Sequence, residues 1–161
     1  MILGLGIDLF PIARLERELG RWGSDFLGEF LSEAELAASS TQGWTSGRIA
    51  ASFAGKEAIF KTLGTGRTPE MRWADIEILP VGPPPQRSAH LFATCVHSSK
   101  ETPDRSSASR IHLHGAVRTQ ALTGLADPHS YRLSLELDFF GDHARAIAIA
   151  ESSPHCKGGP A

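Results

Sequence analysis

Residues 48–66, RIAASFAGKEAIFKTLGTG, are the stretch around which the rest of the chain is organised. Apolar side chains recur there at three- and four-residue spacing, which predicts one amphipathic helix. These side chains are Ile49, Phe53, Ala54, Phe60 and Leu63. Thr45 or Ser46 can cap the start of the helix, and Gly64 suits the left-handed residue that closes one.

Two charged residues of this helix, Glu57 and Lys61, are four positions apart and therefore project from one face. A pair of this kind is most often an ion pair on a solvated surface. The alternative is a functional site on this face, and the remaining sequence has to decide between the two.

Length and composition set the broad class of the protein. At 161 residues, the chain is long enough for one domain with a substantial core, and its formal net charge of −2 argues against a dedicated nucleic-acid binder. Two cysteines, Cys95 and Cys156, do not suggest a disulfide framework. No run approaches the ~20 apolar residues that span a bilayer, and the start lacks the basic segment of a signal peptide. We expect a cytoplasmic protein without a membrane segment.

Residues 1–9 are predicted to form a strand in which two faces alternate. One face is apolar, with Leu3, Leu5, Ile7 and Leu9, and the other carries Gly4, Gly6 and then Asp8. Glycine inside a strand often marks the close approach of another backbone or a ligand. Asp8 either caps the next segment or offers a carboxylate to a site on the glycine face.

Shorter elements complete the predicted architecture. Helices are expected at residues 12–23 after Pro11, 33–38 behind a capping box at residues 32–35, and 115–122. Strands are expected at residues 73–79, 91–96, 111–113, 131–139 and 144–151. Together they predict an α+β fold, a small and mostly antiparallel sheet packed on one long helix and shorter helices.

One domain is expected over residues 1–152. Within it, residues 82–85 are predicted to form a rigid turn, and residues 86–110 an insertion or mobile loop. Residues 153–161 are predicted to be a flexible C-terminal tail.

The helix predicted at residues 12–23 has a basic edge. Arg14, Arg17 and Arg21 recur at helical spacing, partly offset by Glu16 and Glu18. Such an edge is usually only solvated, but three arginines in register can also dock an acidic partner.

Several motifs follow one another in a fixed order: GIDL at residues 6–9, SEAEL at 32–36, FAGKEAIFKTLGTG at 53–66, WADIEI at 73–78 and GPP at 82–84. In this order the chain resembles holo-acyl-carrier-protein synthase, the short type of 4′-phosphopantetheinyl transferase. Weaker similarity continues through residues 113–125 and 133–151. The resemblance implies the phosphopantetheinyl-transferase-like fold and transfer of the phosphopantetheine arm of coenzyme A to a serine of a carrier protein.

The resemblance also implies roles for individual residues. Asp8 and Glu57 match the two carboxylates that hold Mg²⁺, or Mn²⁺ in its place, and Lys61 matches a lysine that contacts the phosphate. The proton of the attacking serine would go to Glu57 directly or to water or hydroxide on the metal, and the sequence leaves this choice open.

Further residues match the cofactor and partner sites of the family. Phe53, Lys61 and the turn Gly64, Thr65 and Gly66 are the expected contacts to coenzyme A. Arg14 matches an arginine that faces the acidic carrier protein, and Arg21 extends the same edge. The family forms a homotrimer with sites between subunits, so some apolar surface would be buried only on assembly. The carrier can belong to fatty-acid, polyketide or peptide synthesis.

The chain departs from the family at two motifs. Ser52 stands where the family has an arginine, which would weaken the grip on coenzyme A unless Arg48, Lys56 or Arg67 substitutes for it. The family motif Ser-x-Ser-His reads Ser-Leu-Glu-Leu at residues 134–137, so the histidine is missing.

These departures leave alternatives to an active transferase. One is a degenerate relative that trimerises or binds carrier protein or coenzyme A without efficient transfer. Another is a cation-dependent phosphohydrolase that acts on a nucleotide. Asp8, Glu57 and Lys61 together favour the transferase, because a mere scaffold has no need for two carboxylates around a cation.

Overall fold

The computed structural model describes residues 1–80, 91–97, 109–125 and 131–152. Its strands are β1 (Ile2–Pro11), β2 (Ile76–Pro80), β3 (Leu91–His97), β4 (Ser109–Leu113), β5 (Tyr131–Phe140) and β6 (His143–Ser152). Its helices are α1 (Ile12–Trp22), α2 (Asp25–Gly28), α3 (Glu33–Gln42), α4 (Ser46–Thr62) and α5 (Gly115–Gly124), with a 3₁₀ turn η1 at Trp73–Asp75.

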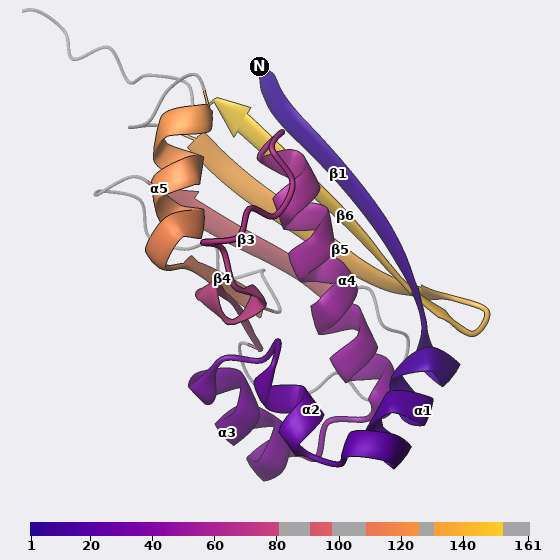
Figure 1. Cartoon of the computed structure of the whole chain (residues 1–161). Coiled ribbons are helices and arrows are strands. Elements are labelled where there is room, and N and C mark those ends of the chain that lie inside the picture. Colours follow the sequence, from indigo (N-terminus) through magenta and orange to yellow (C-terminus); the bar gives the residue numbers. More distant parts are fainter. Residues whose placement is uncertain (81–90, 98–108, 126–130, 153–161) are drawn as a thin grey trace, which may run out of the picture.

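The strands form one six-stranded sheet in the order β1-β6-β5-β3-β4-β2 (Figure 1). All neighbours are antiparallel except β3 and β4. The first and last described strands, β1 and β6, therefore lie side by side at one end of the sheet. The prediction of an α+β fold with a mostly antiparallel sheet is confirmed.

The long helix α4 lies along one face of this sheet, and α1, α2 and α3 gather near its N-terminal end (Figure 1). Its start is capped as predicted, because Thr45 Oγ1 accepts a hydrogen bond of 3.3 Å from the backbone N–H of Arg48. The chain turns away at Gly64, whose φ of +79° is the left-handed conformation expected there.

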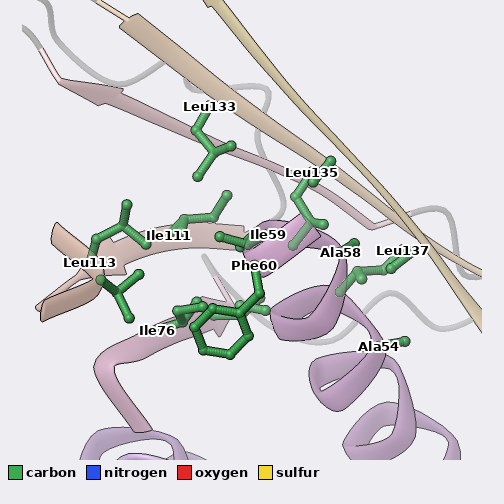
Figure 2. Close-up of a cluster of buried hydrophobic side chains, with 14 of the residues drawn as sticks. Ala54, Ala58, Ile59, Phe60, Ile76, Ile111, Leu113, Leu133, Leu135 and Leu137 are labelled. Carbon is green, nitrogen blue, oxygen red and sulfur yellow. The ribbon is translucent and has the colours of Figure 1, made fainter. Parts of the chain in front are cut away.

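The hydrophobic core lies between α4 and the sheet. Figure 2 shows side chains of β2, β4 and β5 gathered around the turn of α4 that carries Ala58, Ile59 and Phe60. The sheet contributes Ile76, Ile111, Leu113, Leu133, Leu135 and Leu137, all buried. The face of β5 that carries these leucines therefore points into the core.

The two glycines of β1 let this strand approach α4 closely. A Cβ atom added to Gly4 would lie 2.1 Å from the carbonyl oxygen of Thr62, and one added to Gly6 would lie 1.9 Å from that of Ala58. Real side chains do not fit at these distances. The glycine face of β1 therefore packs on α4, and Asp8, the next residue on that face, is brought to the helix.

The opposite face of β1 is apolar and exposed. Leu5, Ile7 and Leu9 are 57%, 50% and 54% exposed. They continue onto β6, where Ile149 and Ile147 pair with Leu5 and Ile7 and are only half-buried. Within the described residues, an apolar strip of the sheet thus faces away from the helices.

A buried ion pair connects α3, α4 and β2. Lys56 Nζ lies 2.5 Å from Glu35 Oε2 and donates to the carbonyl oxygen of Phe30, and both charged side chains are fully buried. Glu35 Oε1 also accepts from Ser52 Oγ at 2.9 Å and from the Ile78 N–H at 3.1 Å. Burial lowers the pKa of Lys56, and the Glu35 carboxylate opposes this effect.

Several sequence predictions need correction, and others lie outside the described residues. The helix that begins at Glu33 runs to Gln42 rather than Ala38 and ends at Gly43, whose φ of +62° is left-handed. Within its last turn the hydroxyls of Ser39, Ser40 and Thr41 bond back to carbonyls of the preceding turn. Residues 73–75 form η1 rather than strand, because Asp75 Oδ2 accepts from the Arg72 N–H at 3.0 Å and closes a turn.

The strand predicted near residues 91–96 is confirmed as β3, so this part of residues 86–110 belongs to the sheet. The rest of the predicted insertion that precedes β4, the turn at 82–85 and the tail at 153–161 lie outside the described residues. In the part of the chain that the structure describes, no helix has the length and apolar character to cross a membrane.

Candidate active site

Four residues predicted for the site form one stripe along α4 and the turn behind it. Phe53, Glu57 and Lys61 follow one another at four-residue spacing, and Gly64 comes next, so all lie on one side of the helix. The stripe is only partly covered, since Phe53 and Glu57 are half-buried and Lys61 is exposed. It can therefore contact a ligand.

Asp8 of β1 reaches this stripe through Lys61. Lys61 Nζ donates hydrogen bonds of 2.8 Å to Asp8 Oδ1 and to the carbonyl oxygen of Ile7. The Lys61 side chain is 50% exposed and that of Asp8 is 17% exposed. The pair thus sits at the surface, beside the edge strand of the sheet.

The contacts along β1 also fix the level at which Asp8 lies. Phe10 packs on Phe53 with ring centroids 4.6 Å apart, and two residues earlier Asp8 bonds to Lys61. Glu57 lies midway between Phe53 and Lys61 on the same stripe. The two contacts of β1 with this stripe therefore lie on either side of Glu57 along the helix.

The other flank of the stripe is formed by Trp73 of η1. Its indole Nε1–H donates a short hydrogen bond to Glu57 Oε1, and its ring lies 5.7 Å from that of Phe53. The guanidinium of Arg67 stacks 4.2 Å from the Trp73 ring, while Arg67 Nη1 donates to the carbonyl oxygen of Met71 at 3.2 Å. Glu57 is thus held by a side chain from a separate segment of the chain.

The donor set suits a hard divalent cation with few protein ligands. Among the described residues, Asp8 Oδ1 and Glu57 Oε1 are already hydrogen-bonded, and Asp8 Oδ2 and Glu57 Oε2 accept no hydrogen bond. No group of three acidic, histidine or cysteine side chains arranged to hold a metal ion occurs within these residues. Mg²⁺ commonly takes one or two carboxylates and fills its other positions with water and phosphate oxygens.

The turn after α4 is open. Gly64 and Gly66 have φ of +79° and +64°, and nothing lies within 4 Å of the Cβ position of either. Thr65 is exposed, with its Oγ1 donating to the Gly66 carbonyl at 3.1 Å. A phosphate can approach the backbone of this turn without a steric barrier.

The position of the missing arginine is buried. Ser52 is fully buried and bonds to Glu35, and Lys56 is committed to the same carboxylate. Arg48 is also mostly buried, and its Nη2 donates to the Ile78 carbonyl oxygen at 3.3 Å. Burial lowers the pKa of Arg48 to about 10. Of the three cations considered as substitutes, Arg67 alone is exposed.

The altered motif on β5 is split between the two faces of the sheet. Leu137 is buried in the core, 3.1 Å from the position that a Cβ on Gly55 of α4 would occupy. Glu136 therefore projects from the opposite face. Within one chain, it does not lie on the face that carries Glu57.

The basic edge of α1 begins close to the site. The Arg14 guanidinium lies 5.5 Å from the ring centroid of Phe10, the residue that packs on Phe53. Arg21 is exposed in the last turn of α1, and Arg17 is 4.0 Å from Glu18. An acidic partner on this edge would be adjacent to Asp8.

Sequence reasoning did not identify the roles of Trp73 and Glu35. Trp73 lies in η1 and Glu57 in α4. Because the two residues belong to separate segments, their separation in the sequence gives no sign of the contact. Glu35 carried a signal only as part of a capping box, which is present, with Ser32 N–H donating to Glu35 Oε2 at 2.9 Å.

Comparison with known proteins gives one consistent family. A family model described as the 4′-phosphopantetheinyl transferase superfamily matches residues 4–111. A holo-[acyl-carrier-protein] synthase from Methylorubrum extorquens (strain PA1) is 30% identical over 156 residues, covering 96% of the chain and 96% of that relative. One from Koribacter versatilis is 38% identical over 78 residues, 48% of the chain and 62% of that relative's own length.

Solved structures agree on the fold. The crystal structure of holo-[acyl-carrier-protein] synthase from Neisseria meningitidis has a TM-score of 0.66 at 25% identity, covering 94% of the chain and 100% of that structure. The Helicobacter pylori synthase, solved in complex with coenzyme A, has a TM-score of 0.60 at 24% identity, covering 91% and 99%. The predicted phosphopantetheinyl-transferase-like fold is therefore confirmed, and nothing in these similarities favours a degenerate relative.

Proposed function

Because the chain belongs to the 4′-phosphopantetheinyl transferase superfamily, we propose that it acts as a holo-[acyl-carrier-protein] synthase. It transfers the 4′-phosphopantetheine arm of coenzyme A to a serine hydroxyl of an apo carrier protein and releases adenosine 3′,5′-bisphosphate. The observation that carries this proposal is the bond between Asp8 and Lys61. It joins a carboxylate of β1 to the stripe of α4 that carries the Glu57 carboxylate and the Lys61 ammonium.

We propose Mg²⁺, with Mn²⁺ as its substitute, as the metal that Asp8 and Glu57 hold. Each carboxylate has one oxygen without a hydrogen bond among the described residues, and these two oxygens are the proposed ligands. When bound, a divalent cation would stabilise negative charge on the pyrophosphate of coenzyme A.

Lys61 and Glu57 have the proposed catalytic roles. The Lys61 ammonium donates to the departing phosphate, which lowers the cost of the charge that develops there. The Glu57 carboxylate, or a neighbouring water, accepts the proton of the carrier serine. The serine oxygen attacks phosphorus in line and forms the new oxygen–phosphorus bond, while the bond between that phosphorus and the bridging oxygen of the pyrophosphate breaks.

The coenzyme A site is proposed along the stripe, from Phe53 to the turn after α4. Residues 64–66 offer an open turn to the phosphates, and Phe53 offers part of its ring to the bound molecule. Arg67 takes the place of the arginine that Ser52 replaces, because it is exposed while Arg48 and Lys56 are committed to buried contacts.

The acceptor is proposed to dock on α1. Arg14 and Arg21 supply the positive charge, and Arg14 is next to Phe10 at the border of the site. A carrier bound there would present its serine close to Asp8. Both the acceptor and coenzyme A are expected in the cytoplasm, where we place the enzyme.

A homotrimer is the proposed assembly. It rests on the family resemblance and on the exposed apolar strip formed by Leu5, Ile7 and Leu9 of β1 and Ile147 and Ile149 of β6. Burial of such a strip between subunits removes apolar surface from water and stabilises the assembly.

The transfer reaction is tested with purified protein, coenzyme A, Mg²⁺ and several apo carrier proteins. The expected result is a carrier whose mass increases by one phosphopantetheine group. A carrier whose acceptor serine is changed to alanine should gain no mass, and neither should the wild-type carrier after the metal is removed with a chelator. Release of inorganic phosphate from a nucleotide without a carrier would favour the phosphohydrolase instead.

A further inference from the structure

Trp73 contacts two charged residues of the site with two different parts of its indole. The ring nitrogen donates to Glu57 Oε1, and the ring face carries the Arg67 guanidinium at 4.2 Å. Its other neighbour is Phe53, with ring centroids 5.7 Å apart and an interplanar angle of 35°. One side chain therefore contacts both the Glu57 carboxylate and the exposed Arg67 guanidinium.

We propose that Trp73 is a positioning residue that orients the Glu57 carboxylate for the divalent cation. This inference rests on the proposed metal site of Asp8 and Glu57. Trp73 itself touches neither the substrate nor the metal in this proposal. It acts by holding Oε1, so that Oε2, which accepts no hydrogen bond among the described residues, is the oxygen left for the cation.

The physical reason is the freedom of the glutamate side chain. Glu57 is half-buried on a helix, and its three side-chain torsions let the carboxylate sample several directions. A fixed donor on one oxygen selects one of these directions before the cation arrives. Hydrogen-bond partners that hold metal ligands commonly change metal affinity by ~10–100-fold when they are removed.

The indole is itself held in place from the backbone. It begins η1, a turn closed by two contacts between Arg72 and Asp75: the N–H to Oδ2 at 3.0 Å and an ion pair of 3.1 Å. β2 follows immediately and fixes the turn to the sheet. Arg67 and Phe53 then restrict rotation of the ring, so its N–H points steadily at Glu57.

The decisive variant is Trp73→Phe, which removes the N–H donor and keeps an aromatic ring beside Phe53 and Arg67. Trp44→Phe is a closely matched control. Trp44 also donates its Nε1–H to a side-chain oxygen, that of Gln42 at 3.4 Å, and also carries an arginine, Arg48, at 4.7 Å from its ring. It lies before the start of α4 and has no contact with Glu57.

Binding of Mn²⁺ alone, followed through the electron paramagnetic resonance signal of the free ion, measures the effect without any transfer reaction. We expect Trp73→Phe to weaken Mn²⁺ binding by about tenfold and Trp44→Phe to leave it unchanged. In a Glu57→Gln background, Trp73→Phe should add no further loss, because the carboxylate it orients is gone. The thermal unfolding midpoint of each variant shows that the chain is folded.

Unchanged Mn²⁺ affinity in folded Trp73→Phe would overturn the inference, and so would an equal loss in Trp44→Phe. If the wild-type chain binds no Mn²⁺, the metal site and the role of Trp73 both fail. If Mn²⁺ binding depends on Glu57 and on Trp73 but the chain modifies no carrier protein, the proposed transfer is refuted and the positioning role is supported.

Discussion

At the scale of single residues, the observed contacts of Lys61 differ from the contact to the departing phosphate that is proposed for it. Its ammonium bonds to Asp8 and to the Ile7 carbonyl, and half of the side chain is exposed. An exposed ion pair contributes at most about 1 kcal/mol to folding, so stability does not explain this arrangement. A phosphate that enters beside Asp8 would find the ammonium already in place.

Replacing Lys61 with alanine should therefore impair chemistry rather than folding. We expect kcat to fall by about 10²–10³-fold, the range seen when one donor to a developing negative charge is removed. The KM for the carrier protein should change little, because Lys61 is not on α1. Steady-state kinetics with a varied carrier concentration checks this split, and a normal kcat in Lys61→Ala would contradict the assignment.

Residue motifs led to the principal members of the site, but not to their partners. Asp8, Glu57 and Lys61 were predicted as site residues from the resemblance to the transferase family, and the glycine-lined strand and the helical spacing agree with that assignment. The bonds from Trp73 to Glu57 and from Ser52 to Glu35 were not predicted, because they join separate segments whose relative placement depends on the packed fold. Long-range contacts of this kind leave no periodic signal.

At the scale of secondary-structure elements, the site depends on the contact between β1 and α4. Gly6 determines how close these elements come, since its missing Cβ would lie 1.9 Å from the carbonyl oxygen of Ala58. If the strand moves outward, Asp8 loses its place beside Lys61. The geometry of the site and the stability of the fold are thus linked at one glycine.

The variant Gly6→Ala should lose both stability and activity. We expect the free energy of unfolding to fall by about 3 kcal/mol, as for other overpacked sites, and transfer to fall with it. Gly20→Ala is the control, because Gly20 lies inside α1 with nothing within 4 Å of its Cβ position. That variant should be up to about 1 kcal/mol more stable than wild type. Urea unfolding measures the free energy of unfolding of both variants. A Gly6→Ala variant as stable as wild type would contradict the close approach of β1 to α4.

The buried pair of Glu35 and Lys56 joins α3, α4 and β2 beneath the site. Glu35→Gln leaves an uncompensated ammonium, and Lys56→Met leaves an uncompensated carboxylate, so each should cost about 3–5 kcal/mol. The double variant should lose much less than the sum of the two, because no buried charge remains unpaired. Additive losses in chemical denaturation would mean that the two charges do not depend on each other.

Element boundaries were predicted well where capping residues mark them. Thr45 and Gly64 delimit α4 as expected, and the capping box at Ser32 begins α3. The end of α3 and the turn η1 were missed. In both places polar side chains bond to nearby backbone groups, and these local bonds outweigh the apolar pattern.

At the scale of the whole molecule, the sheet has one face covered by helices and one that carries the exposed apolar strip of β1 and β6 (Figure 1). Strand order was beyond sequence patterning, because β1 pairs with β6 across nearly the whole length of the chain. This pairing puts the strip and the proposed active site on opposite faces of the same edge strand. Assembly through the strip would therefore bring another subunit close to the site.

A charge in the middle of the strip tests the proposed homotrimer. We expect Ile7→Asp to shift the molar mass measured by light scattering from that of a trimer toward that of a monomer, because a carboxylate in an apolar interface is costly. Thr123→Asp, on the exposed side of α5, should leave the mass unchanged. A wild-type chain that is monomeric at micromolar concentration would contradict the assembly.

The most direct test of the account is the mass of an apo carrier protein after incubation with coenzyme A, Mg²⁺ and either wild-type chain or Glu57→Gln. We expect the wild-type chain to add one phosphopantetheine to the carrier serine and Glu57→Gln to add almost none, although its fold should remain intact. Efficient transfer by Glu57→Gln would contradict the assignment of the site, and no mass gain on any carrier would contradict the proposed function.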